Sequence, residues 1–302
     1  MLPCSYDRDM TESPSAPPIV STAWLDDHLD DEDLRIVDAT ITLRPPADAC
    51  AGWTAVDGSA AHQDEHLPRA QYADLLRDFS APVGRFARPP LEQLTESLQR
   101  LGIGADSRVV IYDRAGAMWA ARLWWVLRSY GFENASVLDG GFARWVAEGR
   151  PTTSEPFAPV AGPGTAFIPR DRPELFVDKA DVLDVVQNGG AVLVNALDTA
   201  DFVATTSSSY ARPGRIPGSV SQPASRLTRD DGSFLPVEQL RTELDDVLSQ
   251  PGPKVTYCGG GIAASLAALV LTQLGEDDVA VYDASYEEWA SDASLPVEVE
   301  PG

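Results

Sequence analysis

Cys258 stands between a short apolar run and three consecutive glycines. The run, 255–257, has the composition of a buried strand, and the residues from 263 to 274 follow a helical pattern. A helix N-terminus presents unpaired N–H groups and a positive dipole end, which together favour an anion. A thiol at such a place ionises more easily, and the thiolate is the nucleophilic form of cysteine. The spacing therefore predicts a nucleophilic cysteine beside a backbone cradle.

The predicted cradle is the loop that follows the cysteine. Glycine lets a loop curl so that successive N–H groups point inward, toward one anion. The residues assigned to it are Gly259, Gly260, Gly261, Ile262 and Ala263. A nucleophile held in this way needs neither a metal nor an organic cofactor, and we predict none.

Two other interpretations of Cys258 compete with this one. The simpler is a buried, inert cysteine, since free cysteine is among the most buried residue types. The three glycines and the internal repeat of the chain argue against it. A cysteine phosphatase or arsenate reductase also places its nucleophile before a helix, but its loop needs an arginine to clamp the oxyanion. Six positions beyond Cys258 stands Ala264, and the loop holds no cation, so the sequence argues against this chemistry.

The elements that must position Cys258 occur twice, because the chain repeats its motifs at half-length. The matching pairs are Tyr112 and Trp145, 33 positions apart, and Tyr257 and Trp289, 32 positions apart. Each pair brackets a helical pattern and a second apolar run. Asp113 takes the place of Cys258 in the first half. Because a carboxylate cannot do the work of a thiol, we expect the first half to be catalytically silent.

Each half alternates short β-rich runs with helical patterns, as βαβ units do. The predicted fold class is α/β, with two tandem domains, each a mostly parallel sheet with helices on both faces. We divide the chain into a disordered leader at 1–18, an N-terminal domain at 19–150, a linker at 151–169 and a catalytic C-terminal domain at 170–302. Helices are also predicted over 91–101 and 237–248. The active cleft is expected between the domains, at the carboxyl ends of the second-domain strands.

Composition excludes several classes of function. The chain has 302 residues, 44% of them hydrophobic, and a formal net charge of -23, so nucleic acid and anionic membranes are unsuitable partners. Its cysteines, Cys4, Cys50 and Cys258, are far apart and lack the spacing of a zinc site. The first 18 residues lack the apolar core of a signal peptide, and no apolar run reaches transmembrane length. A cytoplasmic location is expected.

The order of these motifs resembles the two-domain rhodanese-type sulfurtransferases, of the thiosulfate/3-mercaptopyruvate group. The segments that show it are 257–263, 215–219, 138–142 with Trp145, and Trp124–Trp125. The resemblance implies two rhodanese-like domains and a persulfide on Cys258. This persulfide would take sulfane sulfur from a small anionic donor, 3-mercaptopyruvate or thiosulfate, and pass it to cyanide or a thiol. The alternative is a low-turnover sulfur carrier or regulatory binding module. The oligomeric state stays open, although a monomer is plausible.

The chain departs from this family where the donor's charge should be held. Leu197 and Asp201 stand where the family has arginines, and the loop after Cys258 has neither cations nor hydroxyl groups. We therefore expect Arg212, Arg215 or both to bind the anionic donor; surface arginines near a turn are the alternative.

Other polar and aromatic residues give weaker indications. His66 is expected to be structural, and His62 is placed at the rim of the cleft. Asp64 or Glu65 is a candidate for proton transfer. The tryptophans are expected in the core or at the domain interface, with Trp119 close enough to reach the cleft.

Overall fold

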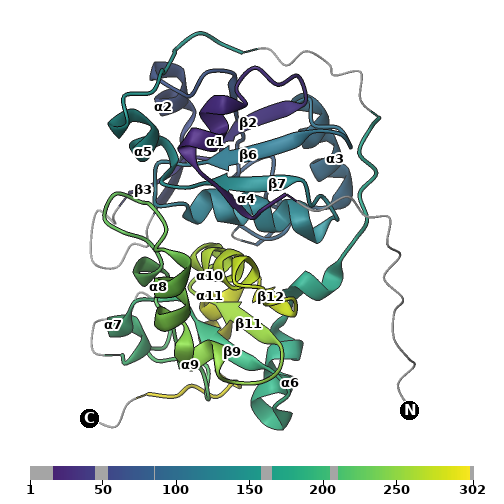
Figure 1. Cartoon of the computed structure of the whole chain (residues 1–302). Helices are drawn as coiled ribbons and strands as arrows, with labels where there is room; N and C mark the ends of the chain where they lie inside the picture. Colours follow the sequence, from purple (N-terminus) through teal and green to yellow (C-terminus); the bar gives the residue numbers. More distant parts are fainter. Residues whose placement is uncertain (1–15, 45–53, 85, 158–164, 205–209, 300–302) are drawn as a thin grey trace, which may run out of the picture.

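The computed structural model describes residues 16–44, 54–84, 86–157, 165–204 and 210–299, which form two parallel sheets, one in each half of the chain (Figure 1). The first sheet has the order β1-β7-β6-β2-β5, and the second has the order β10-β9-β11-β12-β8. The strands of the first are β1 (Ile19–Val20), β2 (Leu34–Asp38), β5 (Ala70–Tyr72), β6 (Arg108–Tyr112) and β7 (Ala135–Leu138). Those of the second are β8 (Phe176–Val177), β9 (Val192–Asn195), β10 (Val220–Ser221), β11 (Lys254–Tyr257) and β12 (Val279–Tyr282).

Every strand pair within the two sheets is parallel. When the second order is reversed, it matches the first strand for strand, with β6 in the place of β11. The predicted fold class and the repeat are thereby confirmed. A separate antiparallel hairpin joins β3 (Ile41–Arg44) to β4 (Thr54–Asp57).

The central strands of each sheet are buried on both sides, because helices cover both faces of the sheet. The first half contains α1 (Thr22–Asp27), α2 (Ser59–Asp64), α3 (Leu91–Arg100), α4 (Met118–Ser129) and α5 (Gly141–Ala147). The second contains α6 (Lys179–Asn188), α7 (Thr199–Phe202), α8 (Val237–Glu243), α9 (Asp245–Leu248), α10 (Ile262–Gln273) and α11 (Ser285–Ser291). The single helix predicted over 237–248 is divided in two at Leu244. None of the helices among the described residues is long and apolar enough to cross a lipid bilayer.

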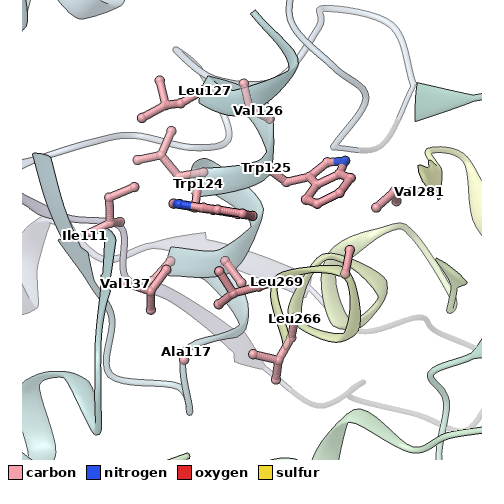
Figure 2. Packing of buried hydrophobic residues seen from close by; sticks show 14 of the residues in the cluster. Ile111, Ala117, Trp124, Trp125, Val126, Leu127, Val137, Leu266, Leu269 and Val281 are labelled. Atoms are coloured by element: carbon pink, nitrogen blue, oxygen red, sulfur yellow. The ribbon is translucent and has the colours of Figure 1, made fainter. Parts of the chain in front are cut away.

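The two halves meet along α4 and α10, whose buried side chains belong to one hydrophobic cluster. Figure 2 shows α4, which carries Trp124 and Trp125, beside α10, which carries Leu266 and Leu269. The indole N–H of Trp125 donates to the carbonyl of Leu175, at 3.0 Å. The interface is therefore part of the hydrophobic core. It holds the first domain against α10, the helix that follows the cysteine loop.

The ends of the domains have their own contacts. Most of the predicted leader, 1–15, lies outside the described residues, but the carbonyl of Pro18 already accepts the N–H of Val137, at 2.8 Å. Within the predicted linker, Thr153 pairs with His66 in an antiparallel bridge. The first part of the linker therefore lies against the first domain; residues 158–164 are outside the described residues.

Candidate active site

Cys258 follows β11, the central strand of the second sheet, and is 3% exposed. Its N–H donates to the Ser285 hydroxyl at 3.1 Å, and its carbonyl accepts the N–H of Tyr286 at 2.9 Å. The next carbonyl, of Gly259, accepts the N–H of Glu287 at 3.0 Å. The start of α11 thus holds the backbone on both sides of the cysteine, and the sequence analysis did not identify Ser285. Its left-handed backbone, with φ 55°, matches Gly141 at φ 52° in the first half, and this equivalence was visible in the repeat.

Two glycines of the loop, Gly259 and Gly261, are required by close contacts. Gly261 precedes α10 with φ +81°, and a Cβ there would lie 2.7 Å from the carbonyl oxygen of Asp283. A Cβ on Gly259 would lie 2.2 Å from the Tyr210 hydroxyl. Tyr210 therefore places a hydroxyl group against the first residue of the loop, although the loop itself has none. The ring of Tyr210 is packed edge-on against Tyr286, with centroids 5.4 Å apart.

The first domain shows what the equivalent loop can hold. The carboxylate of Asp113 accepts four backbone N–H groups, from Ala115 at 2.7 Å, Ala117 at 3.0 Å, Trp119 at 2.8 Å and Ala120 at 2.8 Å. Burial raises the pKa of the Asp113 carboxyl, and these four donors act in the opposite direction. An acceptor side chain at this position is therefore surrounded by donors from the loop and the first turn of the helix.

The two loops differ in length by one residue. The residue before α4 is Ala117, four positions after Asp113, whereas the residue before α10 is Gly261, three positions after Cys258. This explains the spacings of 33 and 32 positions between the matching tyrosines and tryptophans. When the helices are matched by their first residues, the second-domain counterparts of the last three Asp113 donors are the N–H groups of Gly261, Ala263 and Ala264.

Arg212 is engaged elsewhere, so the structure does not support its predicted role in binding the donor. Its guanidinium donates to four carbonyl groups at and beyond the C-terminal end of α11. The acceptors are Trp289 at 2.9 Å, Ala290 at 2.9 Å, Asp292 at 2.6 Å and Leu295 at 2.8 Å. These bonds satisfy carbonyls that a helix end leaves without partners, which is a structural role.

Arg215 is likewise occupied within its own domain. It is 7% exposed, its Nη2 is paired with the Glu298 carboxylate, and its Nη1 donates to the carbonyl of Phe202 at 3.3 Å. The guanidinium also lies over the Phe202 ring, 4.3 Å from the centroid. The expectation that Arg215 binds the donor is therefore not supported either. The sequence did not reveal these partners of Arg215, because Glu298 is distant from it in the chain.

A cation does reach the loop, from the first domain. Arg122 of α4 is 3% exposed, and a Cβ on Gly261 would lie 3.2 Å from its Nη1. Its Nη2 donates to Asp283 and to the carbonyl of Phe86, both at 2.5 Å. Its Nη1 has no hydrogen-bond acceptor in the part of the chain that the structure describes. Sequence analysis missed Arg122 because only the packing of α4 against α10 brings it here.

The aromatic wall of the loop also comes from the first domain. A Cβ on Gly260 would lie 3.7 Å from the Phe86 ring, which packs edge-on against Trp119 with centroids 5.2 Å apart. Trp119 therefore approaches the loop through Phe86.

Leu197 and Asp201 follow β9, which is paired with β11, so the chain places an apolar and an acidic residue at this edge of the sheet. Burial raises the pKa of Asp201, and the neighbouring Asp198 adds to the effect.

The polar run of the first domain has other partners among the described residues. His66 is buried, with its ring nitrogens 2.7 Å and 3.2 Å from the carbonyls of His62 and Glu155. Glu65 accepts the hydroxyl of Thr152 at 2.6 Å. The contacts found for this run lie within the first domain and the linker. The proposed proton-transfer role of Asp64 or Glu65 therefore gains no support from these contacts.

A doubled parallel α/β domain with a cysteine loop before a helix defines a class of protein, and comparison with known proteins identifies it. The family model for the rhodanese-like domain matches residues 21–148 and again 180–292. The chain belongs to the rhodanese-like family.

Named relatives give the class of reaction. The chain is 29% identical over 290 residues to the 3-mercaptopyruvate sulfurtransferase of Escherichia coli K12, covering 92% of this chain and 97% of the relative. It is 30% identical over 282 residues to the thiosulfate sulfurtransferase of Gallus gallus, covering 90% and 92%. The crystal structure of SseA from Escherichia coli, a 3-mercaptopyruvate sulfotransferase, superposes with a TM-score of 0.74 at 27% identity, covering 89% of this chain and 99% of that one. The protein is an enzyme of the sulfurtransferase class.

Proposed function

We propose that the protein transfers sulfane sulfur through a persulfide on Cys258, in two half-reactions. The thiolate attacks the transferable sulfur of a small anionic donor, and a new S–S bond forms on Cys258. The electron pair of the broken bond leaves with the donor, as sulfite from thiosulfate or as the enolate of pyruvate, which takes up a proton, from 3-mercaptopyruvate. Cyanide or a thiolate then attacks the outer sulfur, and the electron pair of the S–S bond returns to the Cys258 thiolate.

The main support for this proposal is the pair of equivalent loops. In the first domain the loop surrounds the Asp113 carboxylate with four N–H donors. In the second domain a thiol takes the same position, where its thiolate or persulfide anion would meet the N–H groups of a loop of the same kind, 259–264. Donors fixed in a buried loop stabilise an anion without reorganising, which favours both the thiolate and the persulfide.

We further propose that Arg122, not Arg212 or Arg215, supplies the positive charge beside the loop. Its Nη1 lies against Gly261 and lacks an acceptor among the described residues, whereas Arg212 and Arg215 donate to acceptors in their own domain. Because Asp283 partly balances the charge of Arg122, this site suits a singly charged donor group better than a doubly charged one. This favours 3-mercaptopyruvate over thiosulfate.

The second candidate function is a low-turnover sulfur carrier or regulatory binding module. The observation that favours it is the burial of Cys258, which is 3% exposed. A persulfide enclosed in this way would be protected from acceptors. Both functions require the sulfur adduct on Cys258, so the adduct alone does not distinguish them. They differ in the rate at which an acceptor removes the sulfur.

The test is the mass of the intact protein after incubation with 3-mercaptopyruvate or thiosulfate. The enzyme is expected to gain one sulfur atom and to lose it at once when cyanide is added. Cys258→Ser should abolish the gain, while the double variant Cys4→Ser/Cys50→Ser should retain it, because those cysteines lie outside the motif. An adduct that cyanide removes only slowly would favour the carrier. Absence of any adduct with either donor would overturn the persulfide proposal.

A further inference from the structure

A cavity of about 540 Å³ lies in the first domain, in a region that the sulfur-transfer chemistry does not use. It is bounded by α2, the strand β5, helix α3 and the linker segment 154–157. Its volume falls within the range of small-molecule sites. β5 is the edge strand of its sheet, so one side of its backbone is not paired within the sheet, and its residues line the cavity.

One wall of the cavity holds a buried aspartate–histidine pair. The Nδ1 of His62 lies 3.0 Å from Oδ2 of Asp38, which is fully buried. The Asp38 carboxylate also accepts the N–H of Thr40 at 3.0 Å and the hydroxyl of Tyr112 at 3.0 Å. Because a carboxylate accepts, the proton of the imidazole is fixed on Nδ1. In the neutral imidazole, Nε2 on the far side of the ring is then a hydrogen-bond acceptor, and His62 lines the cavity.

The ring of His62 is held rigidly. It is stacked on the ring of His66, with centroids 4.1 Å apart and planes 16° from parallel. His66 is itself fixed between the carbonyls of His62 and Glu155. The ring of Tyr72 also contacts the ring of His62, in a tilted arrangement with centroids 5.8 Å apart. A histidine side chain fixed by a carboxylate and by stacking holds its Nε2 in one orientation, which favours a specific hydrogen bond to a ligand.

The fold does not require this pair, as the second domain shows. There Asn195 occupies the position of Asp38 and donates to the hydroxyl of Tyr257, the counterpart of Tyr112, at 3.0 Å. Arg215 stands at the position of His66. The equivalent strands of the second domain thus pack without an aspartate–histidine pair. The pair in the first domain is therefore available for a function of its own.

The remaining lining indicates an uncharged ligand with an apolar body. Phe79, Leu101 and Phe157 form apolar walls. The cation of the cavity, Arg100, is paired with Asp78 at 3.0 Å, which leaves no uncompensated positive charge for an anionic group. Since Nε2 is an acceptor in the neutral ring of His62, a ligand that bonds to it must bring the proton.

We propose that this cavity binds a small neutral molecule with a flat apolar body and a hydroxyl group that donates to Nε2 of His62. The apolar body lies between the phenylalanine walls, and the hydroxyl group completes the chain of hydrogen bonds that begins at Asp38. Binding at this site is independent of the chemistry at Cys258.

The test compares phenol with its methyl ether, anisole, which has the same ring but no proton to donate. Imidazole ¹⁵N spectra of the whole protein suit this purpose because the chain has three histidines, and His28, directly after α1 and stacked on Trp24, serves as the internal reference. Phenol should shift the Nε2 signal of His62 saturably and bind about tenfold more tightly than anisole, because anisole leaves the acceptor without a partner. Affinities in the millimolar range are expected for ligands of so few atoms.

The variant His62→Phe keeps a ring stacked on His66 but removes the acceptor, so it should bind phenol and anisole equally. Should this variant fold poorly, the comparison of the two ligands on the wild-type protein still decides the question. Phenol that does not bind, that binds without moving the His62 signal, or that binds no better than anisole would overturn the proposal.

Discussion

Tyr210 lies against Gly259, the first residue of the cysteine loop. The space that a side chain at position 259 would need is filled by the Tyr210 hydroxyl, 2.2 Å from the Cβ position, while the ring carbon Cζ is 3.1 Å away. Gly259 is not in a left-handed conformation, so its backbone would accept alanine without strain. The glycine is therefore needed because of its neighbour and not because of its own dihedral angles.

This contact predicts that Gly259→Ala destabilises the protein and that Tyr210→Phe restores part of the loss. Overpacking of this kind typically costs about 1–3 kcal/mol, and removing the hydroxyl takes away the closest of the colliding atoms. The free energies of unfolding of the two single variants and the double variant, measured in denaturant, give the coupling. Gly260→Ala is the matched control, because its Cβ would meet nothing nearer than 3.7 Å. Additive effects of the first two substitutions would contradict the prediction.

At the residue scale, the sequence allowed some roles to be predicted and not others. The arrangement of Cys258 and its glycines could be predicted because strand, loop and helix are consecutive in the chain. The partners of Arg212 could not, since they lie 77 to 83 positions further on, at and beyond the C-terminal end of α11. Arg122 lies on α4 of the other domain, so its contact with Gly261 depends on how the domains meet.

At the scale of the elements, the loop before α4 differs from the loop before α10 in one decisive way. Asp113 binds the N–H groups of its own loop, so the first domain contains its acceptor permanently. The sequence repeat predicted that this domain is silent, and the structure gives a physical reason for keeping the carboxylate: it satisfies donors that the start of α4 would otherwise bury unpaired.

Asp113→Ala is therefore expected to lower the free energy of unfolding by about 3 kcal/mol, because it leaves several buried N–H groups without an acceptor. Asp113→Asn, which keeps one acceptor oxygen, should have a smaller effect. Both are measured by denaturant unfolding. Sulfur transfer per folded molecule should be unchanged in either variant, because Asp113 is not part of the proposed reaction. A loss of transfer in a fully folded Asp113→Asn protein would show that the first domain takes part in the chemistry.

At the scale of the whole molecule, the two domains hold each other in equivalent ways. Asp139 accepts the N–H of Phe234 at 2.8 Å, and its counterpart Asp283 accepts the N–H of Arg88 at 2.8 Å. Each of these aspartates thus follows the same strand of its own sheet and binds the backbone of the other domain. The prediction of two tandem domains followed from the repeat, but their shared core could not be predicted, because an apolar helix such as α10 gives no indication of which partner covers it.

Because the core is continuous across α4 and α10, the two domains are expected to unfold together. Leu269 of α10 is fully buried in this cluster (Figure 2), and Leu269→Ala should lower the free energy of unfolding by about 2–5 kcal/mol. All tryptophans except Trp289 precede residue 150, so fluorescence reports mainly on the first domain. A substitution in the second domain should nevertheless shift the fluorescence transition and the circular dichroism transition by the same amount.

The matched control for this experiment is Ile168→Ala, since that side chain is 83% exposed and its loss should change stability by less than about 0.5 kcal/mol. Independent domains would give a different result: the fluorescence transition of Leu269→Ala would stay where it is in the wild-type protein, while part of the circular dichroism signal moved to lower denaturant. Coincident transitions mean that a cavity in α10 weakens the first domain as well. The contact between Arg122 and the cysteine loop would then depend on the stability of both domains, because the same packing of α4 on α10 that forms the shared core brings this arginine to the loop.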